Sequence, residues 1–384
     1  MKGRVFIILK EDIVYYPPVL SIINILLELK YQIIHIGIYS DIEQKKKLEA
    51  KGVIFKPTVF YNKGKRANIV KLYQQLLFRR QVKRYLKKMN ASKEDYIWLM
   101  QAETICLLNS LIGKHKTILH LFEFVVSNIN WKYKIFAPLF SMEKAMKTSG
   151  KVVYCEYNRA QITKGMFHLE VLPYILPNKP FTDEDKSNSV PADIVQMVDK
   201  IKKQLKGKKV ILYQGNFVDK ERRLEEFCQA IKEMPDEYVL VAMGNGTSMY
   251  ETLKTQYECD RIIFVPFIRP PYHLLITQMA SIGILSYFAR SSQLQYVINP
   301  LYCAPNKIFE YARFGIPMLS NDIPGLHYIY LEYQCGECIP YPMTPTSIKD
   351  TILKIFDNYE SYSQGARNYY NSVDMKYLVS QILN

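Results

Sequence analysis

The sequence has no apolar run long enough to cross a membrane, which requires about 20 mainly apolar residues. Its longest uncharged stretch, 270–289, contains His273 and Gly283 and divides into a helical part followed by a strand. The apolar run at 5–9 ends at Lys10 and is too short for the core of a signal peptide. We therefore expect a cytoplasmic protein, either free or bound peripherally to the inner face of the membrane.

Cysteine, tryptophan and glycine are infrequent. The seven cysteines include a single CxxC pair, Cys335 and Cys338, with neither a second CxxC nor a nearby pair of histidines. A zinc site of the usual spacing is therefore not expected, and reduced thiols in a cytoplasmic protein explain the cysteines. Glycine (16) and proline (19) are too few, and hydrophobic residues (48%) too many, for a mainly disordered or collagen-like chain.

Negative charge is in deficit. The chain has 51 Lys and Arg residues against 36 Asp and Glu residues, which gives a net charge of +15. Such a balance indicates an anionic partner, namely nucleic acid, a membrane surface or a phosphorylated substrate. The sequence contains no base-stacking or groove-reading motif, so we expect no nucleic acid partner and keep a basic nucleic-acid-binding protein only as an alternative.

Short apolar runs alternate with longer amphipathic stretches, which indicates parallel sheets covered by helices on both faces. The expected strands are 5–9, 32–38, 53–55, 96–100, 117–121, 151–155, 210–214, 238–243, 261–265, 282–287 and 317–320. Four prolines interrupt 171–192, between the two series. The sequence therefore predicts an α/β fold of two Rossmann-like, doubly wound domains facing a cleft, at 1–175 and 176–361. The tail 362–384 is expected to pack back on the first domain.

The segment 302–325 carries the strongest chemical signal. Pro305 stands where a first helical turn begins, and the free N–H groups there, together with Lys307, can hold a phosphate or diphosphate. Glu310 lies one turn further, near the same face as Asn306, and a carboxylate can accept both hydroxyl hydrogen bonds of a ribose. From the residues alone, an ordinary buried helix with Glu310 as a hydrogen-bonded acid is the alternative.

The pattern PNKxFEYxxxGxPxxxxDxPG in this segment resembles the donor-binding helix of retaining glycosyltransferases of the GT-B fold, close to family 4. Segments at 154–160, 213–217 and 239–246 are similar to other parts of the same family, and the likeness spans roughly 115–330. The resemblance implies transfer of a sugar, with retention, from a nucleotide-sugar that is UDP-linked. The implied acceptor is a glycan or a lipid-linked molecule, in the biosynthesis of a bacterial surface polysaccharide.

The same resemblance implies a donor site in the second domain. Glu310 would bind the ribose, and Arg222 aligns with the family's diphosphate-binding lysine. Pro266 and Phe267 would lie against the base. The other donor-binding residues implied are Gly215, Asn216, Gly244, Tyr302, Asn306 and Lys307. Fixed cations and backbone amides would stabilise the departing nucleoside diphosphate, so neither a cofactor nor a metal is expected.

Two positions depart from the family pattern. Tyr302 stands where the family has a glutamate that often touches the donor sugar, and Asn216 stands where it has an arginine. Neutralisation of the phosphates would then rest on Arg222, Lys307 and backbone amides. These departures motivate an alternative function, a catalytically silent GT-B partner subunit.

His120 follows an expected strand, and its surroundings resemble a segment that faces the cleft in this family. The resemblance makes His120 the candidate catalytic residue, in contact with the donor sugar or the acceptor. The alternative is a hydrogen-bonded histidine at a strand end.

The stretch 69–89 predicts a helix with a strongly basic face. Apolar residues recur at helical spacing, and seven Lys and Arg residues occupy the other positions. Such a helix can bind an anionic membrane, at about 1 kcal/mol for each basic residue near the surface. An ordinary helix that covers the sheet and exposes a solvated basic face is the alternative.

Overall fold

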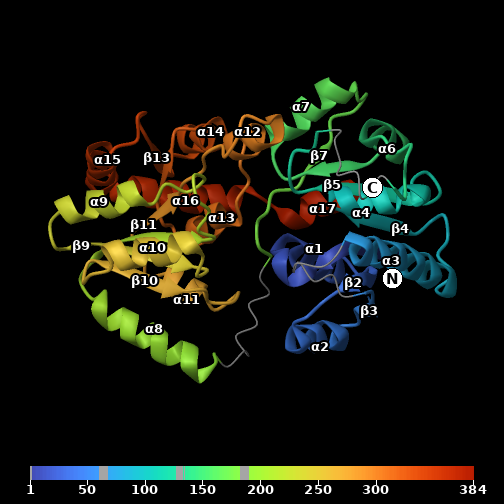
Figure 1. The fold of residues 1–384 in the computed structure, drawn as a ribbon, viewed down its shortest axis with the longest axis horizontal. Coiled ribbons are helices and arrows are strands. Elements are labelled where there is room, and N and C mark those ends of the chain that lie inside the picture. Colours follow the sequence, from blue (N-terminus) through green and yellow to red (C-terminus); the bar gives the residue numbers. More distant parts are fainter. Residues whose placement is uncertain (1, 60–67, 127–132, 134, 182–189) are drawn as a thin grey trace. The chain divides into compact units, whose positions relative to one another are not determined.

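The computed structural model describes residues 2–59, 68–126, 133, 135–181 and 190–384 (Figure 1). The chain divides into two compact units. Unit 1 comprises Met1–Asp183 and Asp374–Asn384, and unit 2 comprises Glu184–Val373. Within the described residues, no helix combines the length and the apolar character needed to cross a bilayer.

Unit 1 is built on a seven-stranded parallel sheet. The strand order is β3-β2-β1-β4-β5-β6-β7, so the chain leaves β1 in one direction and then returns to its other side at β4. The strands are β1 (Arg4–Asp12), β2 (Gln32–Ile38), β3 (Ile54–Pro57), β4 (Tyr96–Met100), β5 (Lys116–Leu121), β6 (Val152–Tyr154) and β7 (Tyr174–Ile175). The central strands are buried along most of their length because helices cover both faces.

The helices of unit 1 follow its strands and close its core. They are α1 (Pro17–Glu28), α2 (Ile42–Ala50), α3 (Asn68–Lys88), α4 (Ala102–Leu107), α6 (Met142–Ser149), α7 (Tyr157–Phe167) and the C-terminal α17 (Met375–Leu383), with short 3₁₀ turns at Ile13–Tyr15 and Asn109–Leu111. Two side chains tie α17 to the sheet. The Tyr96 hydroxyl donates to the carbonyl of Leu383, and Lys151 Nζ donates to the carbonyl of Ile382 at 2.7 Å.

Unit 2 repeats the same winding with six parallel strands in the order β10-β9-β8-β11-β12-β13. The strands are β8 (Lys209–Gly215), β9 (Tyr238–Gly244), β10 (Ile262–Pro266), β11 (Ile282–Leu285), β12 (Met318–Asn321) and β13 (Gly336–Ile339). In both units the order reverses beside the first strand, at β1/β4 and at β8/β11. Ligands of doubly wound sheets bind beyond the carboxyl ends of the strands at this switch point.

The helices of unit 2 are α8 (Ala192–Gln204), α9 (Glu225–Glu233), α10 (Ser248–Tyr257), α11 (Leu274–Thr277), α12 (Leu294–Leu301), α13 (Asn306–Arg313), α14 (Pro324–Tyr333), α15 (Pro345–Asp357) and α16 (Tyr359–Ser372).

The C-terminal segment 362–384, expected to form one tail, is divided between the two units. Tyr369 of α16 stacks on Phe309 of α13 with ring centroids 5.1 Å apart, so α16 belongs to unit 2, whereas α17 belongs to unit 1.

Candidate functional site

The carboxylate of Glu310, fixed by two neighbouring side chains, lies at the switch point of unit 2. Gln214, near the end of β8, donates from Nε2 to Glu310 Oε2 at 2.5 Å, and His273 Nε2 lies 3.2 Å from Glu310 Oε1. Thr277 donates in turn to Gln214 Oε1 at 2.7 Å, which fixes the orientation of the amide. The Glu310 side chain is 13% exposed. Three elements therefore aim one carboxylate at the place where a ligand of this fold binds.

Two cations stand beside this carboxylate. Lys307 Nζ lies 4.7 Å from the ring centre of Tyr213 and 5.3 Å from that of Tyr287, while the guanidinium of Arg222 lies over the Tyr287 ring at 4.5 Å. Burial and then the charge of Arg222 lower the pKa of Lys307 to about 7, although Glu310 acts in the opposite direction. The charge of Arg222 disfavours the protonated form of Lys307, so an anion bound between them would favour the protonated lysine.

The loop that carries Arg222 is anchored by its backbone. Ser286 Oγ donates to the carbonyl of Arg222 at 2.6 Å, and the guanidinium donates to the carbonyl of Ser286 at 3.4 Å. Glu221 lies 3.7 Å from the same guanidinium, so the arginine is partly neutralised. The start of α13 adds free backbone N–H groups at Asn306, because the preceding Pro305 has no side-chain acceptor that could cap the helix.

Two glycines allow strand ends and side chains to approach closely here. A Cβ atom on Gly244 would lie 1.9 Å from the carbonyl oxygen of Gly215, which no side chain tolerates. Gly215 has φ +136°, and a Cβ there would lie 3.0 Å from Lys307 Nζ. The packing of β9 on β8 thus requires Gly244, whereas the positive φ angle favours glycine at position 215.

The other expected donor residues lie around the same edge of the sheet. The side-chain oxygen of Asn216 accepts from Asn245 Nδ2 at 2.9 Å, and its carbonyl accepts from the Tyr213 hydroxyl at 2.6 Å. Pro266 ends β10, and the following Phe267 is 58% exposed. Tyr302 ends α12 and is partly buried. The donor-binding roles of these residues stay predictions.

His120 lies in unit 1, inside the sheet rather than at a free strand end. It is 1% exposed and packs between Trp98 and Phe122, with ring centroids at 6.1 and 4.4 Å. Neither ring nitrogen has a hydrogen-bond partner among the described residues, and burial lowers its pKa to about 3. A contact with substrate would require the ring to leave this position, so the burial of His120 argues against the expected catalytic role. That role stays a prediction.

Sequence reasoning missed His273 and Gln214, the two residues that hold Glu310. His273 was noted only as a polar residue within an uncharged stretch, and Gln214 only as the end of an expected strand. A signal was present, since a polar side chain that ends a buried strand at a switch point faces the ligand edge. The hydrogen bond to Glu310 could not be predicted from the sequence, because Gln214 and Glu310 are 96 positions apart.

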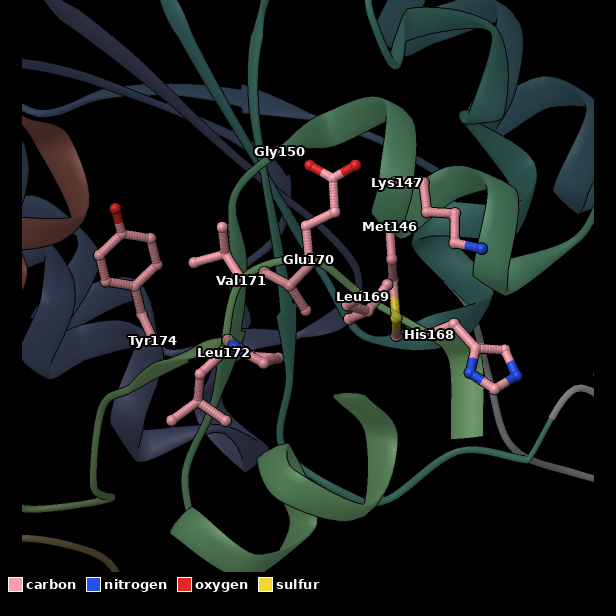
Figure 2. A pocket seen from close by; sticks show the side chains of 11 residues that line it. Met146, Lys147, Gly150, His168, Leu169, Glu170, Val171, Leu172 and Tyr174 are labelled. Atoms are coloured by element: carbon pink, nitrogen blue, oxygen red, sulfur yellow. The ribbon is translucent and has the colours of Figure 1, made fainter. Parts of the chain in front are cut away.

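Figure 2 shows a cavity of about 340 Å³ in unit 1. Its wall includes apolar side chains of Met146, Leu169 and Leu172, and Lys147 and Glu170 also line it. None of the expected donor or catalytic residues is among those lining it.

No family model and no curated protein sequence matches the chain. Solved structures do match. Anabaena HepE in complex with UDP is 12% identical with a TM-score of 0.66, over 99% of this chain and 97% of HepE. A glycosyltransferase from Rickettsia africae is 12% identical with a TM-score of 0.66, over 100% and 97%. The N-terminal domain of Candida albicans trehalose-6-phosphate phosphatase is 12% identical with a TM-score of 0.64, over 100% and 96%.

The chain has the GT-B fold. The expectation of two Rossmann-like α/β domains is thereby confirmed. At such low identity the GT-B likeness concerns the fold alone, and the matched proteins include both a glycosyltransferase and a domain of a phosphatase. The activity must therefore be argued from the site itself.

Proposed function

We propose that this protein is a retaining glycosyltransferase that transfers a sugar from a UDP-sugar to a glycan or lipid-linked acceptor in the biosynthesis of a cell-surface polysaccharide. The observation that carries the proposal is the held carboxylate of Glu310 beside Lys307 and Arg222 at the switch point of unit 2. A nucleoside diphosphate presents the matching groups, namely ribose hydroxyls and phosphate oxygens. HepE, which shares the fold, has been solved with UDP and with UDP-glucose.

Glu310 retains acceptor capacity for a ribose. An ionised carboxylate offers about four lone-pair sites, of which Gln214 and His273 take one each. Two hydroxyl groups can take the others while the first two bonds keep the carboxylate oriented. The exposed ring of Phe267 is available to stack on the base.

Arg222, Lys307 and the N–H groups at the start of α13 would bind the diphosphate. Cleavage of the bond between the sugar and the phosphate increases negative charge on the phosphate, and cations fixed in place stabilise that charge most at the transition state. Lys307 takes up or keeps its proton as the diphosphate binds. We propose that these groups do the work that a divalent metal does in other transferases. Front-face attack by the acceptor within an ion pair then requires no protein nucleophile.

A thermal-shift and calorimetric titration with UDP tests the proposed donor site. UDP should raise the melting temperature of the wild type, since a ligand at a hundred times its dissociation constant stabilises by about 2.7 kcal/mol. Glu310→Ala should weaken UDP binding by about tenfold or more, because it removes charge-assisted hydrogen bonds of about 1.5–3 kcal/mol each. Glu360→Ala, an exposed acid on α16, is the matched control. Absence of any shift with millimolar UDP would overturn the proposal.

The alternative of a catalytically silent partner subunit stays open, because Tyr302 and Asn216 stand where the family pattern has a glutamate and an arginine. Hydrolysis of the UDP-sugar by the isolated chain separates the two functions. Slow release of free sugar that Glu310→Ala abolishes supports an enzyme. UDP binding without any hydrolysis or transfer across a panel of UDP-sugars and acceptors supports the silent subunit.

We further propose that α3 holds the protein at an anionic membrane surface. Phe78, Val82 and Leu86 pack into the core of unit 1, so they are not available to lipid. The first turn instead exposes Ile69 (78%), followed by Tyr73 (58%), and the rest of the outer face is basic. Electrostatic attraction with shallow insertion of these apolar residues fits this arrangement.

Reversal of Arg80, Lys83 and Arg84 to glutamate should release the protein from vesicles that contain anionic lipid and leave UDP binding unchanged. Arg79 is spared, because it donates to the carbonyl of Phe136 at 2.5 Å. Co-sedimentation at low and high salt measures the effect, since salt weakens the attraction. Equal binding by wild type and variant would show that α3 is only scaffold.

A further inference from the structure

Three potential metal ligands meet where β12 and β13 pair in unit 2. Asp322 directly follows β12, His327 lies on α14, and Cys338 lies on β13, which pairs with β12. His327 Nδ1 and Asp322 Oδ1 are 2.8 Å apart, and one ligand atom from each of the three residues lies within 4.8 Å of the others. From the spacing of Cys335 and Cys338 alone no zinc site is expected, but the fold brings a histidine and an aspartate to Cys338.

The cluster borders an open cavity rather than a packed core. The cavity has a volume of about 660 Å³, and all three residues line it. Tyr330 on the same wall is only 5% exposed, and its hydroxyl has no hydrogen-bond partner among the described residues. A buried hydroxyl on the same cavity wall as nitrogen, oxygen and sulfur donors suits a hydrogen bond to a water that a metal holds there.

We propose that Asp322, His327 and Cys338 bind a divalent transition metal of the zinc class, with the fourth coordination position open to water or a small ligand. One thiolate, one imidazole and one carboxylate suit zinc, whereas magnesium and calcium prefer oxygen ligands alone. Tetrahedral zinc, with bonds of about 2.0–2.3 Å, holds neighbouring ligand atoms roughly 3.3–3.6 Å apart. The Asp322–His327 contact must open slightly and the thiol must move inward.

Small movements of this size are available, because the side chains of His327 and Asp322 are 40% and 52% exposed. Glu337, the next acid on β13, is not expected to compete, since Lys354 and the Tyr362 hydroxyl already bind it. On binding, the S–H bond of Cys338 breaks, a metal–sulfur bond forms, and one proton leaves to the solvent. The metal keeps its charge, so no oxidant or reductant takes part.

A metal at this site would fasten the loop between β12 and α14. Gly325, three residues after Asp322, packs so closely on the segment before α13 that a Cβ there would lie 2.9 Å from the Cα atom of Tyr302. A bound metal would tie this loop to β13. The inference does not rest on the proposed transferase activity, and binding of metal alone tests it.

Titration of the metal-free full chain with Co²⁺, followed by its absorption spectrum, tests the proposal. We expect one equivalent to bind, with the intense thiolate-to-cobalt band and the visible bands of a tetrahedral site, and with displacement by Zn²⁺. Cys338→Ser should abolish the thiolate band, and His327→Ala should lower the affinity by more than about tenfold. Cys259→Ser removes an exposed cysteine elsewhere in unit 2 and should change neither.

Calorimetry in buffers of different ionisation enthalpy should show release of about one proton per metal from the wild type. Circular dichroism establishes that each variant is folded before it is titrated. A thiolate band that persists in Cys338→Ser, or one that is lost in Cys259→Ser, would overturn the assignment. So would wild-type affinity no greater than that of His327→Ala.

Discussion

The two sheets share one winding order but carry opposite chemistry at their carboxyl ends. At the switch point of unit 2, Lys307 and Arg222 place positive charge beside the carboxylate of Glu310, and Glu221 neutralises only part of that charge. At the switch point of unit 1, the buried cation Lys10 already pairs with Glu11 at 2.6 Å. The difference teaches that the shared fold fixes where a ligand sits, while the local charges fix which ligand it is.

The edge of unit 1 suits hydroxyl groups rather than phosphates. Lys10 is also bound by the Tyr133 hydroxyl at 2.9 Å, which leaves carboxylates as the dominant groups. Burial and the charge of Glu11 raise the pKa of Glu103, and Glu123 is exposed just beyond β5. Carboxylates accept hydrogen bonds from sugar hydroxyls. We therefore expect the acceptor on unit 1 and the nucleotide on unit 2.

The largest effect should come from the fixed cation of unit 2. Arg222→Ala should lower UDP affinity by about 10- to 100-fold, because charge-assisted hydrogen bonds are worth about 1.5–3 kcal/mol each. Arg223→Ala is the matched control, since the neighbouring arginine pairs with Glu226 through Nε at 2.8 Å. Calorimetry with UDP measures both. Equal losses in the two variants would mean that the net charge of unit 2, and not the geometry of its switch point, binds the diphosphate.

The second effect concerns pH. Lys307 has a pKa of about 7 in the folded protein and about 10.4 when unfolded. Between these values the unfolded chain binds more protons, so the contribution of Lys307 to the free energy of unfolding rises with pH. Lys307→Met should therefore be more stable than the wild type at pH 6, and this advantage should shrink as the pH rises towards 10.

UDP binding should show the opposite trend. The diphosphate favours the protonated lysine, so the affinity advantage of the wild type over Lys307→Met should be largest below pH 7 and fall above it. The comparison of wild type and variant also cancels the titration of UDP itself, whose terminal phosphate has a pKa of about 6. Melting curves and UDP titrations from pH 6 to 9 check both trends, and an advantage independent of pH would place Lys307 outside the diphosphate site.

The sequence predicted the strands of both sheets and the segment around Glu310, but not the side-chain contacts that join distant segments. Runs that are apolar throughout predicted both sheets, because strands buried on two faces cannot alternate with polar residues. The segment around Glu310 was found since helix-start chemistry is local in sequence. The bonds of Gln214 and His273 to Glu310 join residues far apart in the chain, and so does the ring stack of Phe309 on Tyr369 that joins α13 to α16. Such contacts leave no periodic signal.

The smallest effects are expected for substitutions of two histidines, His273 in unit 2 and His120 in unit 1. His273→Ala removes one partner of Glu310 while Gln214 still holds the other oxygen, so UDP affinity should fall by only about fivefold, near 1 kcal/mol for a single hydrogen bond. His120→Phe should leave UDP affinity and transfer activity unchanged. It should also keep or raise the melting temperature, because it removes two buried ring nitrogens that lack partners among the described residues. Two results together would contradict these assignments. One is a loss of transfer activity in His120→Phe at an unchanged melting temperature, and the other is an unchanged UDP affinity in His273→Ala.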